Sequence, residues 1–297
     1  MSRTHANALL LLAALFWGSG NVAQQTILRD LGPYMATSLR CAIASLVIVP
    51  FVFHGGRHRL PSQASTQILL IFTVVSFATA IVAGQIGIGM TSVTNAGFLW
   101  NTSVVVTPFA MWLVFQQKPE AKVWPLAMLT LAGAFLMGGG NILSLNVGDL
   151  LCIFSAIFYS IWMVLLGELV KRSCSGVLIT VLQFASTSLI CLAISLLTEI
   201  NSSVGIQAAL PEVVYLGVVS TAIPFLLQSF AQSRTSASEA AILVSAEAIF
   251  GAAAAYLLLG ESIGPAAMLG AGLIATGIVT IQLLGSKQLP LALSVSV

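Results

Sequence analysis

The sequence predicts an all-α integral membrane protein of ten transmembrane helices, built as two inverted five-helix repeats. The first observation is composition, because 58% of the 297 residues are hydrophobic and only 7% are charged. A soluble domain has about 25% charged residues, so lipid must be the main solvent of this chain. The other two observations are ten apolar segments of spanning length and a self-match at one fixed spacing.

The self-match joins the two halves of the chain at a spacing of 144 residues. Val74–Ser76 returns as Val218–Ser220, and Thr91–Ser92 returns as Thr235–Ser236. A long stretch of each half keeps this spacing without gaps, which indicates a duplicated unit. A membrane protein made of two like halves is typically a transporter whose site lies between them.

The apolar segments are each near the roughly 20 residues that a helix needs to cross the hydrocarbon layer. The expected spans are 6–26, 34–53, 66–88, 94–115, 122–141, 148–169, 176–197, 210–231, 237–259 and 265–284. A spanning helix satisfies its own backbone groups, which lipid cannot do. The connections are short, and only 54–65, 142–147 and 198–209 have room for more than a turn.

The basic residues predict an orientation with both termini in the cytoplasm. With the N-terminus inside, nine of the eleven Lys and Arg residues lie on the cytoplasmic side, which is a strong positive-inside signal. These nine are Arg3, Arg57, Arg59, Lys118, Lys122, Lys171, Arg172, Arg234 and Lys287.

The odd number of helices in each copy makes the second copy enter the membrane upside down. We expect a first repeat over residues 1–145, a second over 146–286 and a short cytoplasmic tail over 287–297. Inverted repeats give a natural route to alternating access, because each half can adopt the shape that the other is leaving.

Several classes of protein are disfavoured by the composition. A net charge of +2 is too small to suggest a nucleic-acid partner. The four cysteines form no C-x-x-C pair and are expected to be buried thiols rather than a metal or disulfide framework. We expect no cofactor and no metal, a small-molecule substrate, the lipid bilayer as surroundings, and a monomer.

Motifs in both halves resemble one family of transporters. They are Leu15–Ser19, Gly32-Pro33, Leu39-Arg40, Ala96–Leu99, Val104–Pro108, Gly148–Leu151, Thr221–Pro224, Thr235–Ser238 and Leu257–Glu261. In order and spacing they resemble the EamA type of the drug/metabolite transporter superfamily, over nearly the whole chain.

This resemblance implies a ten-helix exporter of small metabolites in a bacterial inner (plasma) membrane. Members include amino-acid exporters, such as the YddG-type exporters of aromatic amino acids, and exporters of purine-related compounds, thiol metabolites or drugs. The chain departs from the family pattern at Ala248, where many members have Pro, and at Trp162, where a polar residue is common.

Two charged residues lie inside predicted spans. Glu247 is near mid-membrane, where a carboxylate is costly unless it is paired, protonated or hydrated. It is a candidate for proton coupling or for binding a substrate amine, and the alternative is a structural carboxyl. Arg40 could bind a substrate carboxylate or pair with Glu247, but we favour an arginine whose long side chain extends to the outer interface.

A set of aromatic and polar side chains predicts the walls of a substrate cavity. Polar groups on spanning helices should face protein or water rather than lipid. The candidates for substrate binding are Trp17, Asn21, Gln24, Trp100, Ser103, Tyr159, Trp162, Thr221 and Gln228. Such a neutral, aromatic-walled cavity suits a zwitterionic or amphipathic metabolite and not a polyanion. Each Trp could instead be a packing residue or an interfacial anchor.

Two prolines lie inside predicted spans and are candidate hinges. Pro108 and Pro224 each remove one backbone hydrogen bond and bend the helix. The alternative is a static kink whose freed carbonyl is satisfied by neighbouring groups.

The leading hypothesis is therefore a secondary transporter that exports amino acids by alternating access, with aromatic or other neutral amino acids as the candidates. A multidrug exporter of lipophilic cations is the alternative. An intramembrane enzyme would need convergent His, paired acids or metal ligands at depth, and the predicted spans contain no His and one mid-depth acid. A channel would need a charged ring or a filter-like loop. The sequence shows neither the residues of an enzyme site nor a charged ring or filter-like loop, so an intramembrane enzyme and a channel are distant alternatives.

Overall fold

The computed structural model describes residues 3–54, 63–138, 145–172, 174–200 and 202–286, and the described residues contain helices and no strands. The helices of the first half are α1 (Arg3–Thr26), η1 (Ile27–Arg29), α2 (Pro33–His54), α3 (Ala64–Ile88), α4 (Val93–Trp100), α5 (Ser103–Phe115) and α6 (Val123–Met137). Those of the second half are α7 (Val147–Lys171), α8 (Gly176–Thr198), α9 (Ser203–Ala208), α10 (Leu210–Gly217), the π-helical η2 (Val218–Ala222), α11 (Ile223–Ala231), α12 (Ala237–Val244), α13 (Ala246–Leu259) and α14 (Pro265–Ser286).

The predicted membrane-spanning architecture is present, with one shorter member. Within the described residues, nine helices or runs of consecutive helices are long and apolar enough to cross a membrane. The tenth is α6, Val123–Met137, which has 15 residues and lies within the expected span 122–141. Residues 139–141 of that span lie outside the described part of the chain.

The two spans that were expected to be continuous over 94–115 and 237–259 are each interrupted near the middle. α4 gives way to α5 at Asn101 and Thr102, and α12 gives way to α13 at Ser245. A side-chain bond to the preceding turn accompanies each interruption: Asn101 Nδ2 donates to the Gly97 carbonyl (2.9 Å) and Ser245 Oγ donates to the Ile242 carbonyl (2.6 Å). Such bonds to the preceding turn compete with the helical ladder and bend it.

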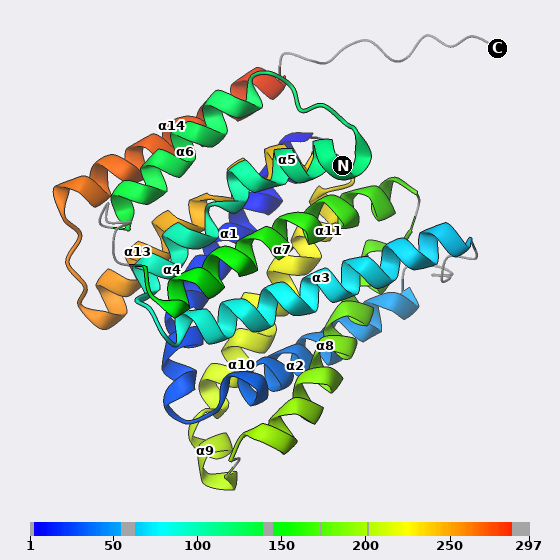
Figure 1. Ribbon diagram of the computed structural model, residues 1–297, viewed down its shortest axis with the longest axis vertical. Helices are drawn as coiled ribbons and strands as arrows, with labels where there is room; N and C mark the ends of the chain where they lie inside the picture. Colours follow the sequence, from blue (N-terminus) through cyan, green and yellow to red (C-terminus); the bar gives the residue numbers. More distant parts are fainter. Residues whose placement is uncertain (1–2, 55–62, 139–144, 173, 201, 287–297) are drawn as a thin grey trace.

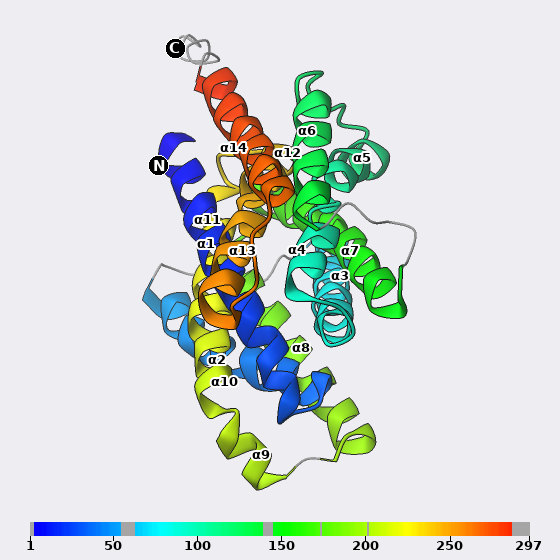
Figure 2. The same ribbon diagram turned by 90° about the vertical axis from the view of Figure 1, so that its left-hand side faces the viewer.

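The expected connection over 198–209 also contains a short helix, α9, that begins at the N-cap Ser202. It lies at one end of the molecule in both views (Figure 1, Figure 2). The side chain of Ser202 accepts a hydrogen bond from the Gly205 backbone N–H (2.9 Å), which satisfies one of the free donors of the first turn.

The halves are interleaved rather than set side by side. α2 packs on α8, α3 on α7, and α6 on α14, so each of these pairs takes one helix from each half. Figures 1 and 2 show the α6–α14 pair at one end of the molecule and the α2–α8 pair toward the other. α1 runs between them and contacts α11, α12 and α13 of the second half. The centre of the molecule is therefore bounded by both halves.

Small residues set the distance between α6 and α14. A Cβ added at Gly133 would lie 2.6 Å from the Gly270 carbonyl oxygen, and one at Gly270 would collide with the Gly133 carbonyl oxygen. Within lipid, helices associate through such close packing because apolar burial gives no advantage over contact with lipid tails.

We predict that Gly270→Ala separates α6 from α14 and lowers the thermal unfolding temperature of the detergent-solubilised protein. The added methyl group overpacks a tight contact, which costs about 1–3 kcal/mol. Gly272→Ala is the matched control, because a Cβ at Gly272 meets no atom within 4 Å. Equal unfolding temperatures for the two variants would contradict the packing assignment.

Candidate functional site

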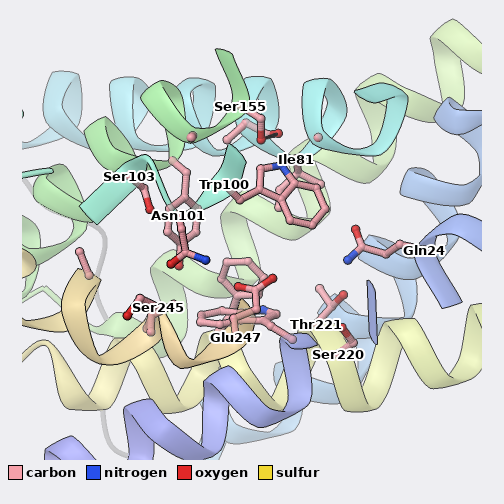
Figure 3. A pocket seen from close by; sticks show the side chains of 18 of the residues that line it. Gln24, Ile81, Trp100, Asn101, Ser103, Ser155, Ser220, Thr221, Ser245 and Glu247 are labelled. Carbon is pink, nitrogen blue, oxygen red and sulfur yellow. Dashed lines mark hydrogen bonds between the residues drawn. The ribbon is translucent and has the colours of Figure 1, made fainter. Parts of the chain in front are cut away.

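A cavity of about 90 Å³ lies where the two halves meet. Its walls come from α1, α2, α3, the α4–α5 break, α7, η2, α11 and the α12–α13 break. Figure 3 shows Trp100, Asn101 and Ser103 on one side of this pocket, with Ser245 and Glu247 on the other. Both interrupted helices therefore turn their breaks toward the same space, as discontinuous helices do at the sites of inverted-repeat transporters.

Aromatic rings form one part of the wall. Trp17 stands edge-on to Phe225 with ring centroids 4.9 Å apart, and to Tyr159 with centroids 6.4 Å apart. Trp100 lines the cavity from the first half, and its indole nitrogen is buried without a hydrogen-bond partner. These rings offer a large, rigid apolar surface to a ligand, and the indole N–H of Trp100 is free to donate a hydrogen bond to it.

Two residues of opposite charge line the same cavity. Arg40 of α2 is 4% exposed, and Glu247 of α13 is half-buried with its side chain at the cavity wall. Arg40 therefore does not extend to the outer interface, and the interpretation that we favoured from the sequence is wrong. The reason is a polar partner at the same depth, since Arg40 Nη1 donates to Gln24 Oε1 (2.9 Å).

A relay of two amides joins these charges along α1. Gln24 Nε2 donates to Asn21 Oδ1 (3.0 Å), and Asn21 Nδ2 donates to Glu247 Oε1 (3.1 Å). Because a guanidinium can only donate and an ionised carboxylate can only accept, the two ends fix the direction of every bond between them. Gln85 of α3 holds Gln24 in place by donating to its backbone carbonyl (2.9 Å).

Neither charge has an oppositely charged partner in contact. No ion pair among the described residues includes Arg40 or Glu247, and the Arg40 Nε is buried without a hydrogen-bond partner. A charged side chain at this depth costs about 3 kcal/mol or more, and the amides offset only part of that cost. The cavity is thus lined by one basic and one acidic side chain, each hydrogen-bonded to an amide and neither in an ion pair among the described residues.

Equivalent positions of the two repeats face each other across the cavity. At the spacing of 144 residues, Trp100, Asn101 and Ser103 correspond to Val244, Ser245 and Glu247, and all six residues line it. These two walls are each formed at the break of an interrupted helix, and they carry different side chains. The acid at 247 has only a serine, Ser103, as its counterpart, so the equivalent positions of the two repeats differ in charge.

Seven of the ten predicted binding and coupling residues lie at the cavity wall. They are Trp17, Gln24, Trp100, Ser103, Tyr159, Thr221 and Glu247. Their roles toward a substrate stay predictions. Asn21, Trp162 and Gln228 lie behind the wall.

The three residues behind the wall have structural partners. Asn21 is the middle of the amide relay. Trp162 is fully buried, donates from Nε1 to Gln183 Oε1 (2.8 Å) and packs on Phe77 and Phe225, so the structure makes it a core residue. Gln228 accepts a hydrogen bond from the Tyr159 hydroxyl (3.1 Å) and thereby orients a ring that does line the cavity.

The prolines also lie off the wall. Pro108 is inside α5, two turns beyond the α4–α5 break, so the interruption of this span does not coincide with the proline. Pro224 is the second residue of α11, directly after the π-helical Val218–Ala222 segment. A wider turn beside a missing N–H is a common way to accommodate a proline in a helix. A hinge role for either proline stays a prediction.

The sequence reasoning missed several wall residues. Asn101, Ser220 and Ser245 line the cavity, and none of them was predicted. The sequence contains a pattern that could have predicted two of them. Asn101 and Ser245 are equivalent at the 144-residue spacing, and both are polar residues in the middle of a span. No group of three or more His, Cys, Asp or Glu that could hold a metal ion occurs in the part of the chain that the structure describes.

Among the described residues, nine apolar helices of spanning length and the shorter α6, in two inverted halves with a polar and aromatic cavity at their junction, define an integral membrane transporter. A model of the EamA-like transporter family matches residues 5–139 and 146–283, so the chain belongs to that family. The sequence-based resemblance and the duplicated fold are thereby confirmed.

Relatives of known sequence are named for the same general activity. Two proteins of Archaeoglobus fulgidus, each called an uncharacterized transporter, are 25% and 24% identical to this chain. The first match covers 95% of this chain and 87% of that protein, and the second covers 88% and 90%. A protein crystal structure is similar with a TM-score of 0.78 at 17% identity, covering 96% of this chain and 99% of that one, which supports the fold alone.

We predict that Asn21 and Glu247 are energetically coupled. Unfolding free energies of Asn21→Ala, Glu247→Ala and the double variant, measured in one detergent, should give an interaction energy of about 0.5–3 kcal/mol. The reason is that either single change leaves the other polar group buried without its partner. Asn21→Ala combined with Gln183→Ala is the control, since these residues belong to separate hydrogen-bonded groups. Additive effects in the first cycle would contradict the relay.

Proposed function

We propose that this protein is a secondary transporter that exports amino acids from the cytoplasm by alternating access around the central cavity. The observation that carries the proposal is that a basic and an acidic side chain, Arg40 and Glu247, line one aromatic-walled cavity without pairing with each other. A zwitterion is the ligand class whose two charges complement both. Its carboxylate would meet Arg40, and its ammonium group would meet Glu247 or the neutral acceptors beside it.

The rest of the wall favours a ligand with an apolar or aromatic side chain. Trp17, Trp100, Tyr159 and Phe225 offer ring faces and edges on which such a side chain can pack. Contacts of this type contribute about 0.5–1.5 kcal/mol per aromatic pair beyond the area that they bury. A polyanion is disfavoured because the wall carries a single arginine.

A multidrug exporter of lipophilic cations is the second candidate. Glu247 with its neighbouring rings would suit a cation, because carboxylates and aromatic faces both attract positive charge. Arg40 argues against it, since its guanidinium would repel the same ligand within a small cavity. The two candidates therefore differ in the role of one residue.

The proposed mechanism uses the inverted halves as two bodies that rock about the cavity. Interleaved pairs such as α2 with α8 and α3 with α7 would slide, while the breaks in α4–α5 and α12–α13 would absorb the bending, together with Pro108 and Pro224. Glu247 would couple transport to protons if the substrate displaces its proton, and otherwise export would be facilitated diffusion. We place this activity in the plasma membrane and in a monomer.

We predict saturable uptake with counterflow of some neutral or aromatic amino acids by proteoliposomes that contain the purified protein. For each such substrate, the amine that lacks the carboxylate and the acid that lacks the amine should compete at least about ten-fold less well. Losing one charge-assisted hydrogen bond costs about 1.5–3 kcal/mol, and 1.4 kcal/mol corresponds to a factor of ten. Arg40→Gln should remove the discrimination against the amine.

A pH gradient separates the two energy sources in the same assay. If transport is coupled to protons, the gradient should drive uptake, and Glu247→Gln should abolish that dependence while exchange continues. Stronger competition by lipophilic cations than by any amino acid would replace the proposal with the multidrug alternative. Uptake that never saturates would contradict a carrier of either kind.

We predict opposite phenotypes for two tryptophans. Trp100→Ala should raise the apparent KM for the best substrate, because the ring lines the cavity. Trp162→Phe should leave KM unchanged and lower the thermal unfolding temperature, because it removes the donor to the buried Gln183 oxygen, a loss of about 1–3 kcal/mol. A raised KM in Trp162→Phe with normal stability would move that residue to the wall.

A further inference from the structure

Polar clusters join the two halves at both faces of the molecule. On the face expected to be outside, Asp149 at the start of α7 accepts hydrogen bonds at Oδ1 from Thr91 Oγ1 and from Asn95 Nδ2, each 2.6 Å long. Thr91 and Asn95 belong to the first half, and Asp149 belongs to the second. We call these three residues the outer cluster.

A second cluster lies on the face expected to be cytoplasmic. Arg3 at the start of α1 forms an ion pair with Glu239 in the first turn of α12. Thr235 Oγ1 lies 3.5 Å from Asn7 Oδ1, at hydrogen-bond distance. Arg3 and Asn7 belong to the first half, and Thr235 and Glu239 belong to the second. We call these four residues the inner cluster.

The two clusters occupy the same place in the two repeats. At the spacing of 144 residues, Thr91 corresponds to Thr235, and Asn95 corresponds to Glu239. Each pair flanks a helix N-cap, because the side chains of Ser92 and Ser236, which are also equivalent, accept from the backbone N–H groups of Asn95 and Glu239. Each cluster then reaches the N-terminal end of the first helix of the opposite half, α7 or α1.

Inversion of the repeats explains why equivalent residues appear at opposite faces. A contact that closes one end of the first half against the second must have a counterpart that closes the other end. We propose that the outer and inner clusters are the two gates of the transport cycle. Each breaks when the cavity opens to its side, and both are formed together in this structure. The assignment rests on alternating access but not on the identity of the substrate.

The chemistry of the two gates differs. The inner gate contains a full ion pair that is partly buried, with the Arg3 side chain 24% and the Glu239 side chain 9% exposed. The outer gate holds a carboxylate with two neutral donors, and beside it Thr94 Oγ1 donates to Glu261 Oε2 (2.6 Å), again across the halves. Neutralising the acid of one gate should therefore shift the population of states toward opening at that face.

The test measures access to the cavity from each side of the membrane. Ser103→Cys places a thiol at the cavity wall. A membrane-impermeant maleimide is then applied to right-side-out and inside-out vesicles, with the parent protein as background for its own cysteines. Glu239→Gln should raise labelling from the cytoplasmic face and lower it from outside, and Asp149→Asn should do the reverse. A change of about five-fold corresponds to 1 kcal/mol of bias.

Glu168→Gln is the matched control, because the ion pairs of Glu168, with Lys171 and Arg172 at the end of α7, both stay within the second half. Combining Arg3→Glu with Glu239→Arg should return labelling to the parent level, since the swap restores the pair. If a single variant does not fold, Thr235→Val and Thr91→Val give the same comparison with neutral residues. Shifts in the same direction at both faces, or folded variants with unchanged labelling, would overturn the proposal.

Discussion

The central constraint on this structure is that a basic and an acidic side chain are held apart at the central cavity, inside the membrane-spanning part of the chain. Arg40 and Glu247 do not touch, and the amides of Gln24 and Asn21 connect them. The relay fixes α1 between α2 of its own half and α13 of the other, because each amide must keep both of its partners. The cavity opens beside this line of bonds, so its position follows from where the buried charges can be supported. The aromatic wall then fills the remainder of the space.

The fold was largely predictable because lipid imposes a simple rule on sequence. Segment length and apolar composition located the spans, and the match of Val74–Ser76 with Val218–Ser220 revealed the duplication. The interruptions at Asn101 and Ser245 were not predicted, since a break of one or two residues leaves the apolar composition of the span unchanged.

The site was only partly predictable, and the errors share a cause. Polar and aromatic residues on spanning helices were correctly placed in the interior, but the sequence could not separate the wall from the layer behind it. Nothing in the sequence separates Trp162 from Trp100, since both are tryptophans on predicted spans. Trp162 is a core residue because it packs on Phe77 and donates a hydrogen bond to Gln183. The position of Arg40 depended on Gln24, a neighbour in space that lies sixteen residues earlier in the chain. Such pairings follow from tertiary structure and not from local pattern.

The amide relay also has a consequence for biosynthesis. Asn21 and Gln24 enter the membrane with α1, while Glu247 arrives with α13, 226 residues after Asn21 in the chain. During synthesis these amides can satisfy each other and, once α2 is inserted, Arg40, but the negative end of the relay is missing until most of the chain has left the ribosome. Early intermediates therefore carry a buried positive charge without the distant carboxylate. The buried positive charge of Arg40 in the first half is therefore matched by the carboxylate of Glu247 only when the second half has been inserted.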